Sequence, residues 1–429
     1  MHGSTRNHLF LLLSLVGAGC NKSPGPPAPS PSAPPGPVRD ATVGPRKGID
    51  GMLKAPARRV NDPERIHFLV FGDSRAGHSR CDPPRKHRKY CRVQYTPTAS
   101  GAAEDCALVS KAPALLMGEV AARLHPSPST PGKIRAQFCL FTGDLVYRGS
   151  CARDWEWARQ VFLAKVPPSS VFPILGNHDS WQKRGESPAF LLFHRAFPQL
   201  KLASPGPSAL PHYYAFRIGR SLFVNLCTGG YPSPGTPADF ERADRTWLCE
   251  RAPFATQMRW MDQVLAHGVT QGVKHVFVQY HKPSFSCSRH PPLNIEQDPL
   301  TRLRPFKKRH PNVNVVALSG HNHTTSVYLS GGVLVLVVGG GGAPQHFLHG
   351  PKACHKDKPD QPPELFWKGG VRTARYNFFD FRVSGDKLSI QEHCLTRRGN
   401  KLTVQTGSRI SASGRITHTP GACNLSPPP

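Results

Sequence analysis

The sequence predicts an α/β protein in which two β-sheets pack face to face and helices flank the sheets. Short apolar runs, several of which stop at a glycine, alternate with helical patterns along the chain, and strand pairs with tight turns follow toward its end. Repeated strand, helix and strand units followed by hairpins are typical of a two-sheet sandwich flanked by helices. With 429 residues, the chain has room for one large domain of this kind or for two domains.

The first 60 residues are predicted to lie outside this fold. Residues 1–20 have the pattern of an export signal, with the basic Arg6, an apolar core over 9–16 and small residues before Cys20. This ending is similar to a lipoprotein signal, so we expect an exported, membrane-anchored lipoprotein, periplasmic or at the cell surface, with Cys20 lipidated. Plain secretion is the alternative. Residues 21–60 form a Pro-rich linker without the apolar residues of a core.

Composition limits the function only loosely. The formal charge of +28 is compatible with a polyanionic substrate and equally with a basic, soluble surface. Twelve Cys residues in an exported chain predict disulfides, and the absence of any Cys-x-x-Cys pair argues against a zinc finger. Cys81, Cys91 and Cys106 are natural local partners, while the overall pairing and the oligomeric state stay open. No later apolar run approaches the ~20 residues of a membrane-spanning helix.

Residues 61–399 are expected to form the domain, with a basic Cys-containing insertion at 76–106 and a flexible tail at 400–429. A helix is predicted over 107–125, with Pro113 as a possible start, and another over 154–166, with Asp154 as its N-cap. The remaining predicted helices are 189–197 and 257–272, and the predicted strands and hairpins are 66–73, 137–142, 212–226, 275–281, 313–323, 332–342 and 376–393, the last turning at 384–386.

Five apolar runs stop at side chains that can bind metal. In chain order they offer Asp73; Asp144 with Tyr147; Asn177 with His178 and Asp179; His281; and His321 with His323. Buried strands of an α/β sheet deliver ligands at their carboxyl ends, so we expect these side chains to meet. Carboxylate, imidazole, amide and phenolate groups together suit a pair of first-row metal ions.

The order of these blocks over residues 65–345 resembles that of the calcineurin-like metallophosphoesterases, and the Asp144–Tyr147 spacing resembles their purple acid phosphatase branch. The resemblance implies a four-layer sandwich with a binuclear metal centre. It also implies the ligands: Asp144 bridges the metals, Asp73, Tyr147 and His323 complete the first, and Asn177, His281 and His321 complete the second. Tyrosinate is a hard anionic ligand, so Fe(III) paired with Fe, Zn or Mn(II) is expected.

Four further residues are expected to assist catalysis. Many relatives have a His ligand where this chain has Arg75, which cannot bind metal but can hold phosphate oxygens with its fork. The resemblance makes His178 a substrate-contacting or proton-donating group, which Asp179 would hold and make more basic. His290 lies nine residues after His281, where phosphatases of this branch often place another such His.

We therefore expect an exported phosphatase that hydrolyses phosphomonoesters by attack of a metal-bound hydroxide, on a phosphorylated small molecule or a polyanion. A phosphodiesterase or nucleotidase on the same scaffold is the alternative, with nucleic acid only as a possible substrate. A third possibility is a non-catalytic surface lipoprotein that binds polyanions through basic segments such as RLRPFKKRH, residues 302–310.

Overall fold

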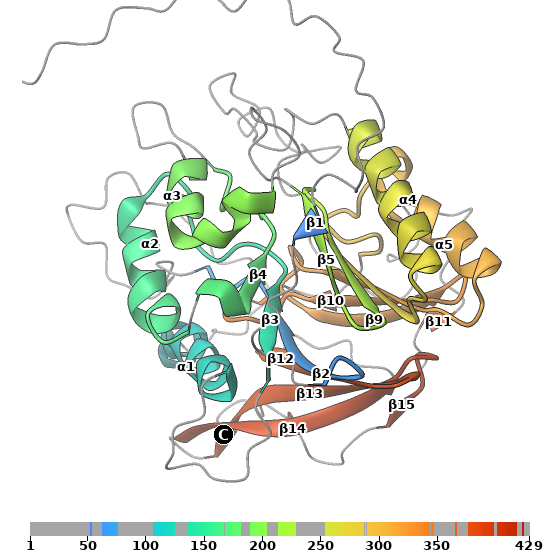
Figure 1. Cartoon of the computed structure of the whole chain (residues 1–429). Helices are drawn as coiled ribbons and strands as arrows, with labels where there is room; N and C mark the ends of the chain where they lie inside the picture. The colour runs from blue at the N-terminus through green and yellow to red at the C-terminus, as the bar shows by residue number, and fades with distance from the viewer. Residues whose placement is uncertain are drawn as a thin grey trace, which may run out of the picture. The chain divides into compact units, whose positions relative to one another are not determined.

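The chain is described by a computed structural model in which residues 48–429 form one unit (Figure 1). The described residues are 52–53, 62–75, 106–124, 136–166, 168–181, 189–203, 213–228, 254–286, 288, 290–343, 345–346, 365–366, 376–398, 401–417 and 423. The predicted export signal with Cys20, nearly all of the linker and nearly all of the 76–106 insertion lie outside them, as do Cys81 and Cys91.

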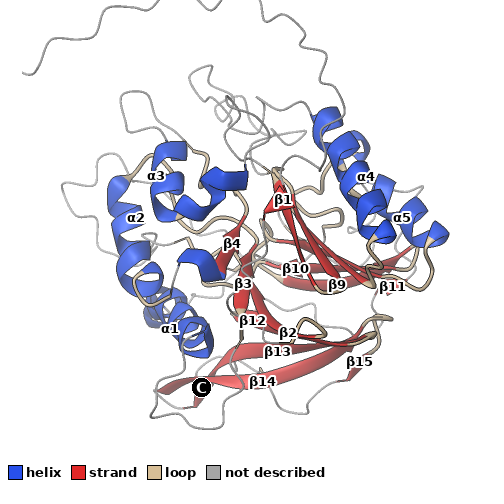
Figure 2. Cartoon of the chain, in the orientation of Figure 1, coloured by secondary structure: helices blue, strands red, loops and turns tan. Residues whose placement is uncertain are grey.

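One sheet has seven strands in the described part of the chain (Figure 2). Its order is β15 (Ile416–Thr417), β14 (Lys401–Ser411), β13 (Lys387–Arg398), β12 (Asn377–Ser384), β2 (Arg65–Phe71), β3 (Phe138–Phe141) and β4 (Val171–Pro173). β2, β3 and β4 are parallel, and β12 joins β2 in antiparallel register. β2 is buried on both faces from its second residue, which explains its continuous apolar run.

The second sheet has eight strands among the described residues. Its order is β1 (Met52–Leu53), β5 (Tyr214–Ile218), β6 (Ser221–Asn225), β7 (His275–Gln279), β8 (Asn314–Ser319), β10 (Val333–Val338), β9 (Thr325–Ser330) and β11 (Leu365–Phe366). β6, β7, β8 and β10 are parallel. β5 and β6 form the hairpin predicted over 212–226, with its turn at Gly219 and Arg220.

Aromatic side chains fill the space between the two sheets. The ring of Phe68 on β2 lies 5.2 Å from Phe223 on β6 and 5.0 Å from Phe277 on β7, both edge to face. Phe138 on β3 and Phe381 on β12 stack against Phe68 within its own sheet. Edge-to-face and offset contacts stabilise aromatic cores beyond the area they bury, by about 0.5–1.5 kcal/mol per pair. This packing sets the distance between the sheets.

Helices cover the outer faces, which completes the predicted layered sandwich (Figure 2). The α-helices are α1 (Cys106–Leu124), α2 (Ala152–Ala158), α3 (Ala189–Ala196), α4 (Phe254–Thr270) and α5 (Leu300–Arg309). The shorter turns are η1 (Arg159–Leu163), η2 (Pro168–Ser170), η3 (Pro198–Ala203) and η6 (Ile295–Gln297). None of the described helices combines the length and the apolar character that crossing a membrane requires.

Two local predictions were wrong. α1 begins at Cys106 and runs through Pro113, which packs against Gly342 instead of starting the helix. Asp154 is not an N-cap: α2 starts at Ala152, a π-helical turn follows it, and the Asp154 carboxylate accepts the Arg148 N–H at 3.1 Å.

The predicted flexible tail at 400–429 is also corrected, because most of its first half is strand. β14 pairs with β13 in antiparallel register, and β15 pairs with β14 in the same way. Beyond them, Cys423 forms a disulfide with Cys394 on β13. The domain therefore extends past the predicted boundary at residue 399.

Candidate metal centre

The polar strand ends of both sheets meet at one place. Asp73, Asp144 and Asn177 follow β2, β3 and β4 of the seven-stranded sheet, whereas His281 and His321 follow β7 and β8 of the other. The two groups are joined directly: the His321 N–H donates to both carboxylate oxygens of Asp73, at 3.0 and 2.8 Å. The parallel strands thus bring together residues that are up to 248 positions apart in sequence.

The first group consists of Asp73, Asp144 and His323. One potential ligand atom from each lies within 4.8 Å of the others, and all three side chains are buried. His323 Nε2 is 3.7 Å from an Asp73 oxygen. Buried carboxylates and an imidazole at this spacing can surround one metal ion.

The second group consists of Asn177, His281 and His321, beside the same Asp144. The Asn177 amide oxygen lies 3.0 Å from His281 Nε2 and 2.9 Å from His321 Nδ1. His281 Nε2 is 3.4 Å from Asp144 Oδ1, so Asp144 takes part in both groups. That is the position a bridging ligand must have.

The protonation of these histidines fits a metal. His281 Nδ1 donates to the Thr142 carbonyl at 2.8 Å, which leaves a lone pair on Nε2 facing two oxygens. His321 Nε2 is buried and, within the described residues, has no hydrogen-bonding partner. Burial lowers the pKa of both rings, so both are neutral, the form that binds metals. The His281 Nε2 lone pair thus faces only acceptor oxygens, an arrangement that a cation would satisfy.

The two aspartates differ in their proton affinity. Burial and the adjacent Asp144 charge raise the pKa of Asp73 well above its ordinary value. Burial also acts to raise the pKa of Asp144, but His281, His178 and Arg75 outweigh it and the pKa is lowered. Two buried carboxyl groups at this distance cannot both ionise easily without a cation. Metal binding here would therefore displace a proton from Asp73.

Backbone strain is concentrated in this centre. Of the five non-glycine residues with positive φ in the described ranges, four are predicted site residues: Asp73 (58°), Arg75 (42°), Asp144 (60°) and His321 (66°). Non-glycine residues pay an energetic cost in the left-handed region, and such outliers cluster at functional sites. The strain aims these side chains inward at the strand ends.

Two glycines next to ligands cannot carry a side chain. Gly143 has a φ of 93°, and a Cβ there would come within 2.6 Å of His281 Nδ1. A Cβ on Gly176 would collide with Asp144 Oδ1. The Gly-Asp and Gly-Asn-His patterns therefore reflect how closely the backbone approaches the ligand atoms.

Asp179 does not hold His178, contrary to prediction. Its carboxylate instead accepts four backbone N–H groups, from Asp144 (2.7 Å), Gly176 (2.9 Å), Leu145 (2.9 Å) and Val146 (3.1 Å). Burial and the Asp144 charge raise the pKa of Asp179, whereas these amides act in the opposite direction. Asp179 thus fixes the loop that presents Asp144.

His178 is neutral, so the expectation that its basicity is raised was wrong. Its Nδ1 donates to the Tyr147 carbonyl at 2.6 Å, which leaves the lone pair on Nε2. Burial, followed by the charge of Arg75, lowers the pKa of His178 to about 3. The Tyr147 ring lies 5.1 Å from the His178 ring and 5.8 Å from Trp181, and its role as a metal ligand stays a prediction.

Arg75 is directed at a ligand. Its Nε lies 3.3 Å from Asp144 Oδ2, and its side chain is only 11% exposed. Its backbone N–H also donates to the Asp144 carbonyl at 2.9 Å. The guanidinium predicted to hold phosphate is therefore anchored at the edge of the metal centre by the carboxylate that would bridge the metals.

Two more histidines border the centre. The predicted His290 lies with its ring 4.5 Å from His321 and 4.9 Å from His346. His346 was not predicted: its ring stacks on His323 at 3.9 Å and its Nδ1 accepts the His323 N–H at 3.2 Å. It follows the apolar run of β10 and a Gly-rich segment, so the strand-end pattern that located the other ligands also precedes it.

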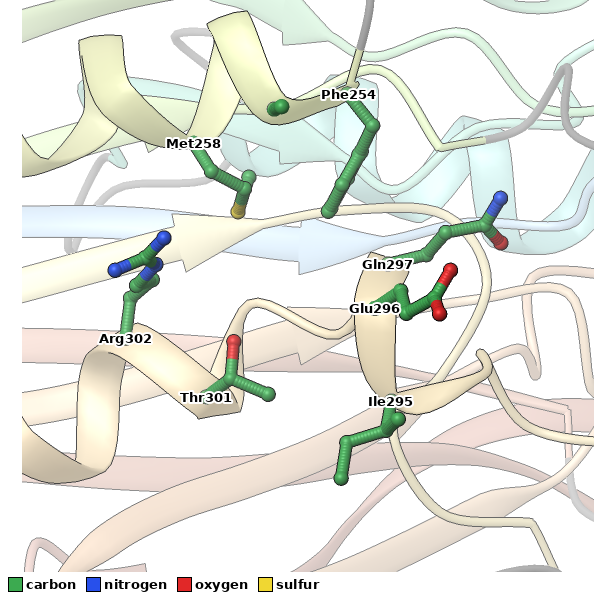
Figure 3. Close-up of a pocket in the computed structure, with 8 residues that line it drawn as sticks. Phe254, Met258, Ile295, Glu296, Gln297, Thr301 and Arg302 are labelled. Carbon is green, nitrogen blue, oxygen red and sulfur yellow. The ribbon is translucent and has the colours of Figure 1, made fainter.

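A separate cavity of about 640 Å³ opens between the first turn of α4 and the segment after His290 (Figure 3). It is lined by Phe254, Ala255, Met258, Ile295, Glu296, Gln297, Thr301 and Arg302. None of the predicted metal ligands lines it. The cavity is therefore distinct from the metal centre.

Comparison with known proteins agrees with this geometry. Residues 122–325 match the family model of the calcineurin-like phosphoesterases, a range that holds six of the seven predicted ligands, all but Asp73. No curated protein matches the chain.

The chain is also similar to three solved structures. Purple acid phosphatase PPD1 from yellow lupin (Lupinus luteus) seeds is 13% identical with a TM-score of 0.45, and the match covers 82% of this chain and 53% of that one. PhoD is 11% identical with a TM-score of 0.47, covering 83% and 71%. A putative 5′-nucleotidase from Staphylococcus aureus is 13% identical with a TM-score of 0.36, covering 81% and 54%.

This chain therefore spans about half the length of the lupin protein. Of the three grouped residues, Asp144 and His323 lie within the matched range and Asp73 lies before it. Over residues 122–325, the chain matches the calcineurin-like phosphoesterase family.

Proposed function

We propose that this chain is a binuclear-metal phosphohydrolase that acts on phosphomonoesters. The observation that carries the proposal is the shared position of Asp144, which lies within 4.8 Å of the Asp73 and His323 ligand atoms and 3.4 Å from His281. When bound, two metal ions would polarise the phosphoryl group and lower the pKa of a coordinated water. Asp73, Asp144 and His323, with Tyr147, would hold the first ion. Asp144, Asn177, His281 and His321 would hold the second.

Residues around the centre have separate roles in substrate binding and proton transfer. Arg75 is cationic and anchored 3.3 Å from Asp144, so it is placed to attract phosphate oxygens at the edge of the centre. A neutral His178 offers a lone pair at Nε2 and accepts a hydrogen bond from the substrate or from water. His290, beside His321, is then the better placed group to donate a proton to the leaving oxygen.

Tyr147 supports iron as one of the two metals. It lies three residues beyond Asp144, is 5% exposed, and would add an anionic oxygen to a metal site whose usual His is replaced by Arg75. Fe(III) prefers such hard ligands. We therefore assign the chain to the purple acid phosphatase-like branch, with Fe(III) beside Fe, Zn or Mn(II).

The basic segment at 302–310 does not favour the alternative of a non-catalytic polyanion-binding protein. Lys307 donates to the Pro311 and Val313 carbonyls at 2.7 and 2.8 Å, and Arg304 lies over the Phe285 ring. Arg302 is 3.7 Å from Asp262. The Arg302–Asp262 pair offsets one of the segment's charges, and Lys307 and Arg304 are held by contacts within the fold.

Metal analysis combined with two substrates tests the proposal. We expect two metal ions per chain and faster hydrolysis of p-nitrophenyl phosphate than of bis(p-nitrophenyl) phosphate. Asp144→Asn tolerates the left-handed backbone but removes the bridging charge, so it should lose metal and activity together. Asp154→Asn, a buried aspartate on α2, is the matched control and should stay active. A preference for the diester would favour the phosphodiesterase alternative, and an active Asp144→Asn would reject the site.

We also propose that the chain is exported and anchored through a lipid on Cys20, on the sequence pattern alone. Cys20→Ser should move the protein from the detergent-soluble membrane fraction to the soluble fraction. Unchanged fractionation would reject the lipid anchor without affecting the proposed activity.

A further inference from the structure

The residue between the two ligand histidines of the Gly-His-Asn-His segment has a hydrogen-bond network of its own. Asn322 is 1% exposed, and its side chain leaves the metal centre to contact the loop that carries His290. Its Nδ2 donates to Ser286 Oγ at 2.8 Å and reaches the His290 carbonyl at 3.5 Å. Its Oδ1 accepts the Ser288 hydroxyl at 2.8 Å.

These contacts fix the orientation of the amide. The Ser286 hydroxyl donates to the His290 carbonyl, so Ser286 Oγ must accept from Asn322 and from the Ser288 N–H at 3.2 Å. A reversed amide would place its oxygen against the His290 carbonyl, where both atoms can only accept. Only the observed orientation satisfies Ser286, Ser288 and His290 together.

The same loop places His290 against the centre. The His290 ring is 4.5 Å from His321, the residue before Asn322, and 4.9 Å from His346, which is stacked on His323. His290 therefore lies between a predicted ligand and the ring that covers another. The contacts of Asn322 with Ser286, Ser288 and the His290 carbonyl lie next to this ring position.

We infer that Asn322 is a positioning residue that clamps the His290 loop to the ligand segment 321–323 and so holds His290 at the reaction centre. The inference rests on the proposed function, in which His290 contacts the substrate. Asn322 lies between His321 and His323 in the chain, so its side-chain bonds connect the position of His290 to that of two predicted ligands. A displacement of about 1 Å at a reacting group can cost about 100-fold in rate, so a clamp of this kind has a measurable effect.

A double-mutant cycle tests the coupling. Asn322→Ala should lower kcat/KM about 10- to 100-fold for p-nitrophenyl phosphate while metal content stays at the wild-type level. In a His290→Ala background, the same substitution should change kcat/KM by less than about threefold, because the residue it positions is already gone. Asn225→Ala is the matched control: Asn225 is equally buried, its amide donates to the Tyr214 carbonyl at 3.3 Å, and it contacts neither Ser286 nor His290 in any recorded interaction. Its effect should be the same in both backgrounds.

Hydrogen exchange separates this inference from the proposed function. Asn322→Ala should speed exchange of the Ser288 amide, which donates to Ser286 Oγ, and Asn225→Ala should not. If His290→Ala leaves activity unchanged, the role proposed for His290 fails, and faster exchange still supports the clamp. Wild-type exchange at Ser288 in Asn322→Ala, or an equal loss of activity with and without His290, would overturn the inference.

Discussion

Asp179→Asn should remove half of the hydrogen bonds by which the Asp179 carboxylate holds the loop that presents Asp144. Two N–H groups bond to each Asp179 oxygen, with the Asp144 and Gly176 amides on Oδ2 and the Leu145 and Val146 amides on Oδ1. An asparagine keeps one acceptor oxygen and turns an NH₂ group toward the other two N–H donors. Burial and the Asp144 charge raise the pKa of Asp179 to about 7, so the carboxylate is ionised above that pH. There, two hydrogen bonds to a charged group are lost, at about 1.5–3 kcal/mol each, and the variant should be less stable by about 3–6 kcal/mol.

The assay is denaturant unfolding of the metal-loaded and the metal-free protein, with metal content measured in parallel. Asp154→Asn is the control, since the hydrogen bond from the Arg148 N–H to the Asp154 carboxylate can be kept by an asparagine oxygen. We expect that control to lose about 1 kcal/mol. If the free energy of unfolding of Asp179→Asn lies within about 1 kcal/mol of the wild-type value and the protein is fully loaded with metal, Asp179 does not hold the Asp144 loop.

Three further outcomes are expected. Iron-loaded protein should be violet to pink from tyrosinate-to-Fe(III) charge transfer, and Tyr147→Phe should bleach this visible band; a colourless, active protein that is insensitive to Tyr147→Phe would argue against the iron assignment. Burial acts to raise the pKa of Asp380, but His393, His67 and Arg382 outweigh it and the pKa is lowered, so ionised Asp380 stabilises the fold above about pH 4 and this stability is lost as pH falls. Asp380→Asn should cost about 3–5 kcal/mol at pH 7 and much less in acid, whereas a pH-independent cost in denaturation curves would contradict the pairing. Cys394→Ser opens a disulfide that spans 29 residues and should lower the free energy of unfolding by about 3–4 kcal/mol in denaturation curves. Cys423→Ser should cost the same, and unequal losses would contradict the disulfide.

The predictable part of this molecule is the part governed by local pattern. β2, β3, β7 and β8 are continuous apolar runs because both faces are buried, and each stops where the backbone turns a ligand inward. Gly143 and Gly176 are required because a side chain would strike a ligand or its neighbour. The strand ends could therefore be located from the sequence.

The hydrogen-bond partners of these side chains could not be predicted from the sequence in this way. Asp179 is adjacent to His178, but its carboxylate bonds to amides 33 to 35 residues earlier, a preference set by the backbone turn after β3. The basicity of His178 likewise depends on burial and on Arg75, which come from other segments. Residue type and spacing predict which side chains gather at the strand ends, whereas hydrogen-bond partners depend on the tertiary fold.

The end of the domain was missed for a related reason. β14 is only partly buried along much of its length and lacks the long apolar run that marks β2, so its signal is weak. Pairing with β13 and the disulfide from Cys394 to Cys423 supply the order that local sequence does not show. The edge of a sheet is specified by its neighbour more than by its own residues.

Anomalous diffraction from crystals of the metal-loaded protein tests the two-metal centre most directly. Two peaks should lie on either side of Asp144, one bounded by Asp73 and His323 and the other by His281 and His321. The distance between them should be about 3.5–4 Å, as in two-metal hydrolases. A fully active protein with a single peak, or with peaks away from Asp144, would contradict the account.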